Sequence, residues 1–159
     1  MNLKGVVMED FLQYKKPCMT LQFPVCSFKC DKEAGESVCQ NSELTSAPCK
    51  SYSVRSICEQ YLKNDISKSI CCQGLEPMDS WGELFYLIRV LRLNYRCYDD
   101  VVIYTGYYPE EIQPQISQLK PLKNIIIKFG RFIPNRPHRY DEILGVELAS
   151  DNQYGVVIC

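Results

Sequence analysis

The stretch MTLQFPVCSFKCDKEAGESVCQNS, residues 19–42, joins an apolar run to a polar segment that holds three cysteines. The run MTLQF (19–23) has the length and apolar content of a buried strand. The segment that follows, 24–50, is irregular and rich in Cys, Ser, Glu and Lys. A loop of this length inside a compact domain is usually functional. We therefore expect a strand that leads into a functional cysteine loop.

Short apolar runs alternate with amphipathic stretches along the rest of the chain. The capping-box spacing of Ser80 and Glu83 predicts the start of a strong helix, and Pro109 is expected to open a short one that Pro114 disturbs. A further helix is expected at 51–63, and strands at 69–72, 101–105, 124–129 and 153–158. This alternation indicates one α/β domain, 1–159, with a mostly parallel sheet.

Turn-forming segments follow each of the first four apolar runs. The cysteine loop follows the first run, QGLEP (73–77) the second, TGYY (105–108) the third and FGRF (129–132) the fourth. The carboxyl ends of parallel strands lie at one edge of a sheet, and ligands bind there. We therefore expect these four segments to converge in space on a binding site.

The composition points away from nucleic acid and membrane as partners. The net charge is −1, 46% of residues are hydrophobic and the longest apolar run, LFYLI (84–88), is far too short to span a bilayer. The N-terminal residues lack the apolar core of a secretory signal, so a cytoplasmic location is expected. In a reducing cytoplasm ten cysteines do not favour a disulfide framework, so a local cluster of them indicates a metal or cofactor site.

Cys26, Cys30 and Cys39 form the pattern C-x3-C-x8-C. Thiolates favour zinc or iron–sulfur clusters. A structural zinc site needs four ligands, for which Cys18 or Cys49 would have to complete the set. A cubane cluster held by three thiolates leaves one iron open for a substrate. Chance clustering in a cysteine-rich chain is the third interpretation.

Four ordered motifs resemble the radical S-adenosylmethionine (SAM) proteins, most closely the activating proteins of anaerobic ribonucleotide reductases. FPVCSFKC (23–30) resembles the cluster loop of that family, and QGLEP its glycine-glycine-glutamate-proline strand end. VVIYTGYYPEEI (101–112) resembles its TGY strand and turn. FGRFIPN (129–135) with ASDNQYGVVI (149–158) resembles its C-terminal segments. The resemblance extends from Cys18 to Ile158.

The resemblance implies an oxidoreductase with a small incomplete (β/α) barrel, in which Cys26, Cys30 and Cys39 bind a 4Fe-4S cluster. The fourth iron of the cluster would chelate SAM, and one-electron reduction would produce a 5′-deoxyadenosyl radical. That radical would take a hydrogen atom from a glycine of a large glycyl-radical enzyme. A low-potential donor such as flavodoxin or ferredoxin would supply the electron. The alternative is a non-catalytic iron–sulfur or zinc-binding regulatory module on the same scaffold.

The resemblance also implies cofactor contacts outside the cysteines. The candidates are Phe28, Gly74, Glu76, Pro77, Thr105, Gly106, Asn152 and Gln153. Without the resemblance, these positions are equally well explained by strand ends and surface turns. Two positions depart from the family pattern. Cys39 lies six residues beyond the usual third cysteine, and Gln73 replaces a glycine that would allow the backbone to approach SAM.

Several other residues have structural explanations. Cys58, Cys71 and Cys72 are expected to pack in the core. Arg131, Arg136 and Arg139 are expected to form a solvated basic loop, with partner docking as the functional alternative, and His138 is expected at the surface. A single histidine does not favour a Ser/His/Asp triad, and no phosphate-binding glycine loop occurs.

Overall fold

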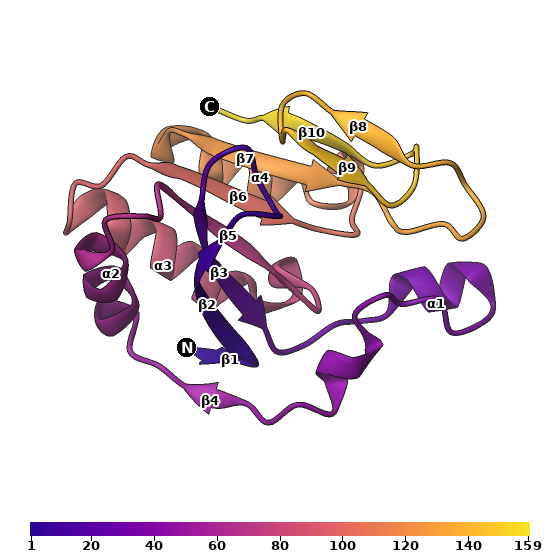
Figure 1. Cartoon of the computed structure of the whole chain (residues 1–159), viewed down its shortest axis with the longest axis horizontal. Coiled ribbons are helices and arrows are strands. Elements are labelled where there is room, and N and C mark those ends of the chain that lie inside the picture. Colours follow the sequence, from indigo (N-terminus) through magenta and orange to yellow (C-terminus); the bar gives the residue numbers. More distant parts are fainter.

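The computed structural model describes all 159 residues and has a six-stranded sheet at its centre (Figure 1). The strands lie in the order β10-β7-β6-β5-β3-β2. They are β2 (Gly5–Asp10), β3 (Cys18–Phe23), β5 (Ser69–Gly74), β6 (Asp100–Tyr104), β7 (Ile125–Phe129) and β10 (Tyr154–Val157). β3, β5, β6 and β7 are parallel, whereas β2 and β10 are antiparallel to their neighbours. This mixed, mostly parallel sheet confirms the α/β class, and it ends at β2 and β10 without closing.

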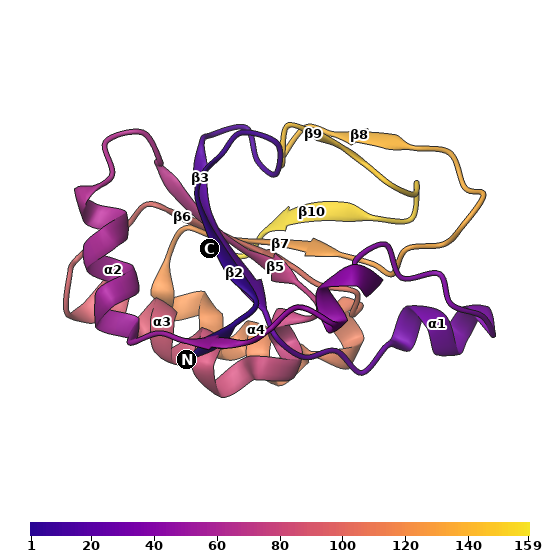
Figure 2. The ribbon, with the colours of Figure 1, turned by 60° about the horizontal axis from the view of Figure 1, so that its bottom comes forward.

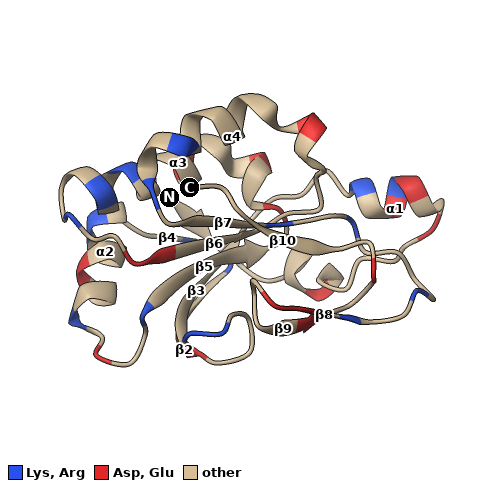
Figure 3. Cartoon of the chain, turned by 90° about the horizontal axis from the view of Figure 1, so that it is seen from above, with Lys and Arg blue, Asp and Glu red and all other residues tan.

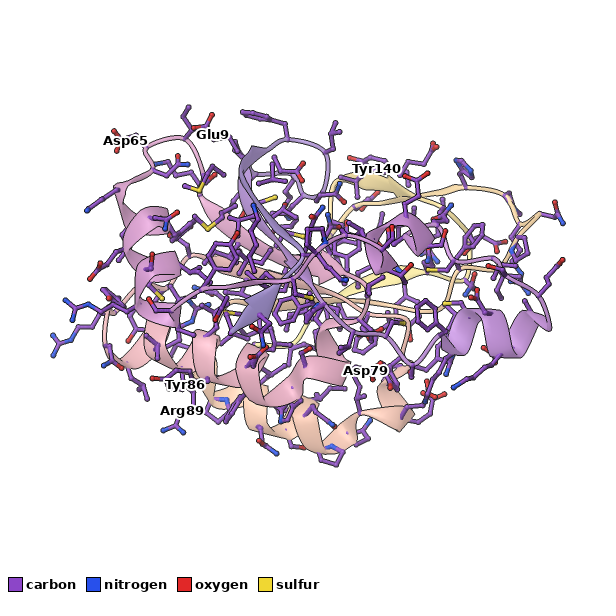
Figure 4. All side chains as sticks on the ribbon, turned by 90° about the horizontal axis from the view of Figure 1, so that it is seen from below. Glu9, Asp65, Asp79, Tyr86, Arg89 and Tyr140 are labelled. Atoms are coloured by element: carbon purple, nitrogen blue, oxygen red, sulfur yellow. The ribbon has the colours of Figure 1, made fainter.

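Helices α2, α3 and α4 cover one face of the sheet, the lower one in Figure 2. They span Val54–Lys63, Trp81–Leu93 and Gln113–Leu119. Their apolar sides, with residues such as Ile57, Leu84 and Leu119, form the main hydrophobic core with strand residues that include Phe23 and Ile103. Tyr86 and Arg89 project from the opposite side of α3 (Figure 4). The core is therefore a single layer of side chains between helices and sheet.

The other face carries a smaller apolar cluster beneath the hairpin of β8 (Arg139–Asp141) and β9 (Val146–Leu148), above the sheet in Figure 2. The turn between β2 and β3 reaches this hairpin, and the Lys15 N–H donates to the Leu144 carbonyl at 2.7 Å. Cys18 and Cys71 are buried in this cluster. The sheet thus has a helical layer on one face and a β-hairpin layer on the other.

The cysteine loop, residues 24–50, extends beyond the carboxyl end of β3 (Figure 1). It contains the short helix α1 (Lys29–Ala34) and the 3₁₀ turn η1 (Ser42–Thr45), neither of which has a buried residue. The loop ends in β4 (Lys50–Ser51), which pairs with β1 (Asn2–Leu3). The loop is therefore anchored at its start by β3 and at its end by the pairing of β4 with β1.

The predicted strands at 19–23, 69–72, 101–105, 124–129 and 153–158 are confirmed within a residue or two. The helix predicted at 51–63 is also present, but it begins three residues later, at Val54. The pattern of apolar residues in the sequence did not predict β1, β2, α1 or the β8–β9 hairpin. No helix has the length and apolar character needed to cross a membrane.

The predicted capping box at the start of α3 is wrong. Ser80 makes no side-chain cap hydrogen bond, because the 3₁₀ turn η2 (Pro77–Ser80) runs directly into α3. Glu83 instead accepts a hydrogen bond from the Asn2 N–H. Pro114 does not interrupt a helix: the 3₁₀ turn η3 (Pro109–Glu111) comes first, and Pro114 lies at the start of α4, where no intrahelical N–H is lost.

Candidate functional site

A cavity of about 320 Å³ lies at the carboxyl ends of the parallel strands. Its lining includes the ends of β5, β6 and β7, the cysteine loop, and β9. The predicted convergence of the four turn segments is therefore confirmed. Residues as far apart in the chain as Leu12 and Gln153 share this one cavity.

Eight of the eleven predicted site residues line the cavity: Cys26, Cys30, Cys39, Gly74, Glu76, Thr105, Gly106 and Gln153. Phe28, Pro77 and Asn152 do not line it. Phe28 precedes α1 in a left-handed conformation (φ 52°), and its N–H donates to the Cys26 sulfur at 3.2 Å. Pro77 is buried at the first position of η2, where it starts the turn after Glu76.

Asn152 and Gln153 have different surroundings although they are adjacent. The Asn152 amide donates to the Arg131 carbonyl at 2.8 Å and supports the Tyr108 hydroxyl. Gln153 is buried, and its amide donates to the Gly130 carbonyl at 3.3 Å. Only Gln153 faces the cavity, while Asn152 holds the turn after β7 in place.

Gly74 must be glycine at the end of β5. Its φ is +105°, and an added Cβ would lie 2.7 Å from the Phe23 backbone nitrogen. The neighbouring Gln73 lines the cavity. The strand end therefore keeps the close backbone approach at position 74 and adds an amide side chain beside it.

Glu76 connects two strand ends from within the cavity wall. Its side chain is buried, with the residue 4% exposed. The Thr105 hydroxyl donates to Oε1 and the Gly106 N–H donates to Oε2, both at 2.8 Å, and the Met78 N–H also donates to Oε1. Burial raises the pKa of Glu76 to about 7, although these three donors oppose the shift. The carboxylate therefore fixes the TGY turn against the end of β5.

Lys128 is a cavity residue that the sequence did not reveal. It lies in the apolar run IIIKF of β7, is 7% exposed, and its ammonium donates to the Gly130 carbonyl at 2.9 Å. Burial lowers the pKa of Lys128 to about 8, while Glu76 and Cys30 nearby favour its charged form. An ammonium has three donors, and only one has a partner within the protein. The other two are available to an anionic group in the cavity. A charged residue inside an otherwise apolar strand was the signal that could have found it.

The chain around Cys26 is held by the region that follows β5. The Ser27 N–H donates to Asp79 at 2.6 Å, and the Tyr107 hydroxyl donates to the other oxygen of the same carboxylate at 2.5 Å. Asp79 lies on the helix side of the molecule, toward α1 (Figure 4). Burial raises the pKa of Cys26 to about 12, and nearby carboxylates add to the effect. The thiol is therefore protonated at neutral pH and would have to lose its proton to bind a metal.

The helix that carries Cys30 is held by ion pairs. Arg131 is 6% exposed, pairs with Glu33 of α1 at 3.0 Å and with Glu111 at 2.6 Å, and stacks over the Tyr108 ring. Lys29 of α1 pairs with the same Glu111 at 2.9 Å. Figure 3 shows the acidic and basic residues side by side on α1.

The expectation of a solvated basic loop is wrong for Arg131, because two carboxylates draw this side chain into the site. The same expectation is correct for Arg136 and Arg139, which are exposed. His138 is exposed as expected, and its Nδ1 lies 2.8 Å from Glu147.

The Cys30 thiol lies against the ends of β6 and β7. A Cβ added to Gly106 would lie 3.6 Å from the Cys30 sulfur, which is ordinary van der Waals contact, so the thiol lies directly beside this glycine. Burial raises the pKa of Cys30, while the backbone of Phe132 and the cations of Lys128 and Arg131 oppose the shift. These groups would stabilise the thiolate once a metal has displaced its proton.

The remaining cysteines lie outside the cavity. Cys58, Cys71 and Cys72 are buried in the core, as predicted. Cys18 is buried at the far end of β3 and Cys49 is exposed, so neither joins the three cavity thiols.

No three Cys, His, Asp or Glu side chains are grouped closely enough to hold one metal ion as they stand.

Comparison of the chain with protein-family models, with curated proteins and with solved structures finds no match.

Proposed function

We propose that this chain is a radical SAM protein of the activating type, with an incomplete (β/α) barrel that binds a 4Fe-4S cluster and SAM. The partner would be a large glycyl-radical enzyme of the anaerobic ribonucleotide reductase type, and flavodoxin or ferredoxin would donate the electron. The observation that carries the proposal is the meeting of three thiols with Gly74, Glu76, Thr105 and Gly106 in one cavity. These are the positions at which the sequence resembles the family.

The residues divide the binding task between them. Cys26, Cys30 and Cys39 would hold the cluster, which when bound and reduced supplies one electron for cleavage of the SAM sulfonium. Lys128 offers two unpaired donors to a carboxylate. Glu76 holds Thr105 and Gly106 so that the turn presents its backbone to the cavity. Under this proposal the three thiols would bind the cluster, Lys128 would bind the carboxylate of SAM, and the backbone of the TGY turn would contact the rest of that molecule.

The first test is the ligand set. We expect anaerobic reconstitution with iron and sulfide to give about four irons per chain, and Cys26→Ala, Cys30→Ala and Cys39→Ala each to lower that number. Cys49→Ala is the matched control, because Cys49 is an exposed thiol of the same loop outside the cavity. A full cluster in all three variants would contradict the assignment.

The second test is the reaction. With dithionite and SAM, the reconstituted protein is expected to release 5′-deoxyadenosine, and Lys128→Met is expected to weaken SAM binding while leaving the iron content unchanged. A full cluster that neither binds nor cleaves SAM would favour the alternative, a non-catalytic regulatory module. Gln73 is the residue to examine in that case, because it lines the cavity where the family has glycine. Gain of SAM binding in Gln73→Gly would identify this side chain as the obstacle.

A further inference from the structure

The eight residues between Cys30 and Cys39 form a closed turn. α1 continues through Ala34 and ends at Gly35, which adopts a φ of +75° and donates its N–H to the Asp31 carbonyl at 2.9 Å. A left-handed glycine at this position is a common way to end a helix and redirect the chain. The extra residues are therefore taken up by one helical segment and its reversal.

The side chain of Asp31 closes this turn. Its Oδ1 accepts the N–H of Val38 at 2.8 Å and the N–H of Cys39 at 2.9 Å. Hydrogen bonds to a carboxylate are about twice as strong as neutral ones, and two donors on one oxygen determine the direction of the chain. Asp31 therefore sets the position of the Cys39 backbone directly.

Asn41 fixes the chain on the other side of Cys39. Its amide donates to the Gly74 carbonyl at 3.0 Å, which ties the loop to the end of β5. The Cys39 backbone thus lies between two fixed points, one within the loop and one on the sheet. Of the other charged side chains of this segment, Glu33 pairs with Arg131, whereas Lys32 and Glu36 are exposed and make no hydrogen bond or ion pair.

We propose that Asp31 is a positioning residue that brings Cys39 to the cavity across the long C-x8-C spacing, before any metal is bound. The inference rests on the proposed function only where it treats the Cys39 thiol as a cluster ligand. The eight residues between Cys30 and Cys39 would then form a helical turn closed by a carboxylate, in place of the two-residue connection of the family pattern.

The first experiment uses the metal-free full-length protein and amide hydrogen exchange measured by NMR. In Asp31→Ala the Val38 and Cys39 amides are expected to exchange about tenfold faster, the change that loss of one charge-assisted hydrogen bond predicts. Asp31→Asn keeps an oxygen acceptor and should retain most of the protection. Glu36→Ala is the matched control and should match the unchanged protein. Unchanged exchange of both amides in Asp31→Ala would overturn the proposal. Faster exchange that extends to β5 and β6 would do the same, because Asp31 would then support the whole fold.

The second experiment measures iron after anaerobic reconstitution. Asp31→Ala is expected to lose iron to the level of Cys39→Ala, whereas Asp31→Asn should recover it. A full cluster in Asp31→Ala despite faster exchange would overturn the positioning role. If the unchanged protein binds no cluster but shows the expected exchange pattern, the proposed function fails and the structural role of Asp31 stands.

Discussion

The parallel strands and the cysteine loop meet at one cavity but are held by different forces. All five residues of β7 and the three central residues of β6 are buried, and they pack mainly through apolar contact. α1 and η1 contain no buried residue, and side-chain hydrogen bonds and ion pairs hold them. Apolar burial is strong but non-directional, whereas charged hydrogen bonds are directional. The sheet therefore provides stability and the loop provides the position of the thiols.

Truncation of a core side chain in the sheet should cause the largest loss of stability. Phe23 is fully buried at the end of β3, so Phe23→Ala is expected to lower the free energy of unfolding by about 3–5 kcal/mol. Urea denaturation of the metal-free protein measures the change. Leu93→Ala, at an exposed position of α3, should cost less than about 0.5 kcal/mol. Equal losses in the two variants would refute the assignment of Phe23 to the core.

Gly74→Ala tests the junction between the two regions. The left-handed backbone and the contact with Phe23 predict a loss of about 1–3 kcal/mol in the free energy of unfolding. Gly82→Ala is the control, because a Cβ there meets no atom within 4 Å and alanine favours the helix. Stability should be unchanged or higher in the control. A stable Gly74→Ala protein would show that the strand end tolerates a side chain.

The pH dependence of stability tests the buried carboxyl group of Glu76. Its pKa of about 7 in the folded protein lies above the ~4.3 of an unfolded chain. Between these values the folded state binds more protons, so this group makes stability fall as pH rises from ~4.3 to about 7, by at most ~1.4 kcal/mol per pH unit. Glu76→Gln should remove that slope in urea midpoints measured across the range. An identical slope in both proteins would contradict the raised pKa.

Glu33→Gln tests the loop side alone and should have the smallest effect on global stability. Glu33 is largely exposed, and its carboxylate pairs with Arg131. The free energy of unfolding should change by less than about 1 kcal/mol. The amides of α1 should nevertheless exchange faster, while those of β5 to β7 do not change. Loss of protection in the strands would show that the loop and the sheet are not separate in stability.

The elements that sequence patterns found are those held by apolar burial. The runs that became β3, β5, β6 and β7 are short and continuous, because both faces of these strands are covered. β2 was missed because its exposed edge position leaves a mixed pattern, and β8 and β9 because three residues show no periodicity. α1 was missed because it has no apolar face.

The candidate site was predictable as a set of motifs but not as a network. The three cysteines, Gly74 and Glu76 stand out as residue types at strand ends, where parallel topology brings them together. Lys128 and Asp31 did not stand out, and Arg131 was expected in a solvated loop, because their roles depend on partners distant in the chain or on how a turn folds. The local sequence pattern shows which side chains are apolar, but it does not show which charged side chains pair with each other in the fold.

The order of apolar runs and turns in this chain is sufficient to specify an α/β sheet and the edge at which the candidate site residues gather, because strands buried on both faces are apolar throughout. The orientation of the thiols depends on contacts made after folding: Asp79 with Ser27, Arg131 with Glu33, and Asp31 with Cys39. These contacts are directional. Each one links two parts of the chain through a hydrogen bond or ion pair between one oxygen and one nitrogen atom. Such pairings exist only once the chain has folded, and the position of Cys39 depends on them most.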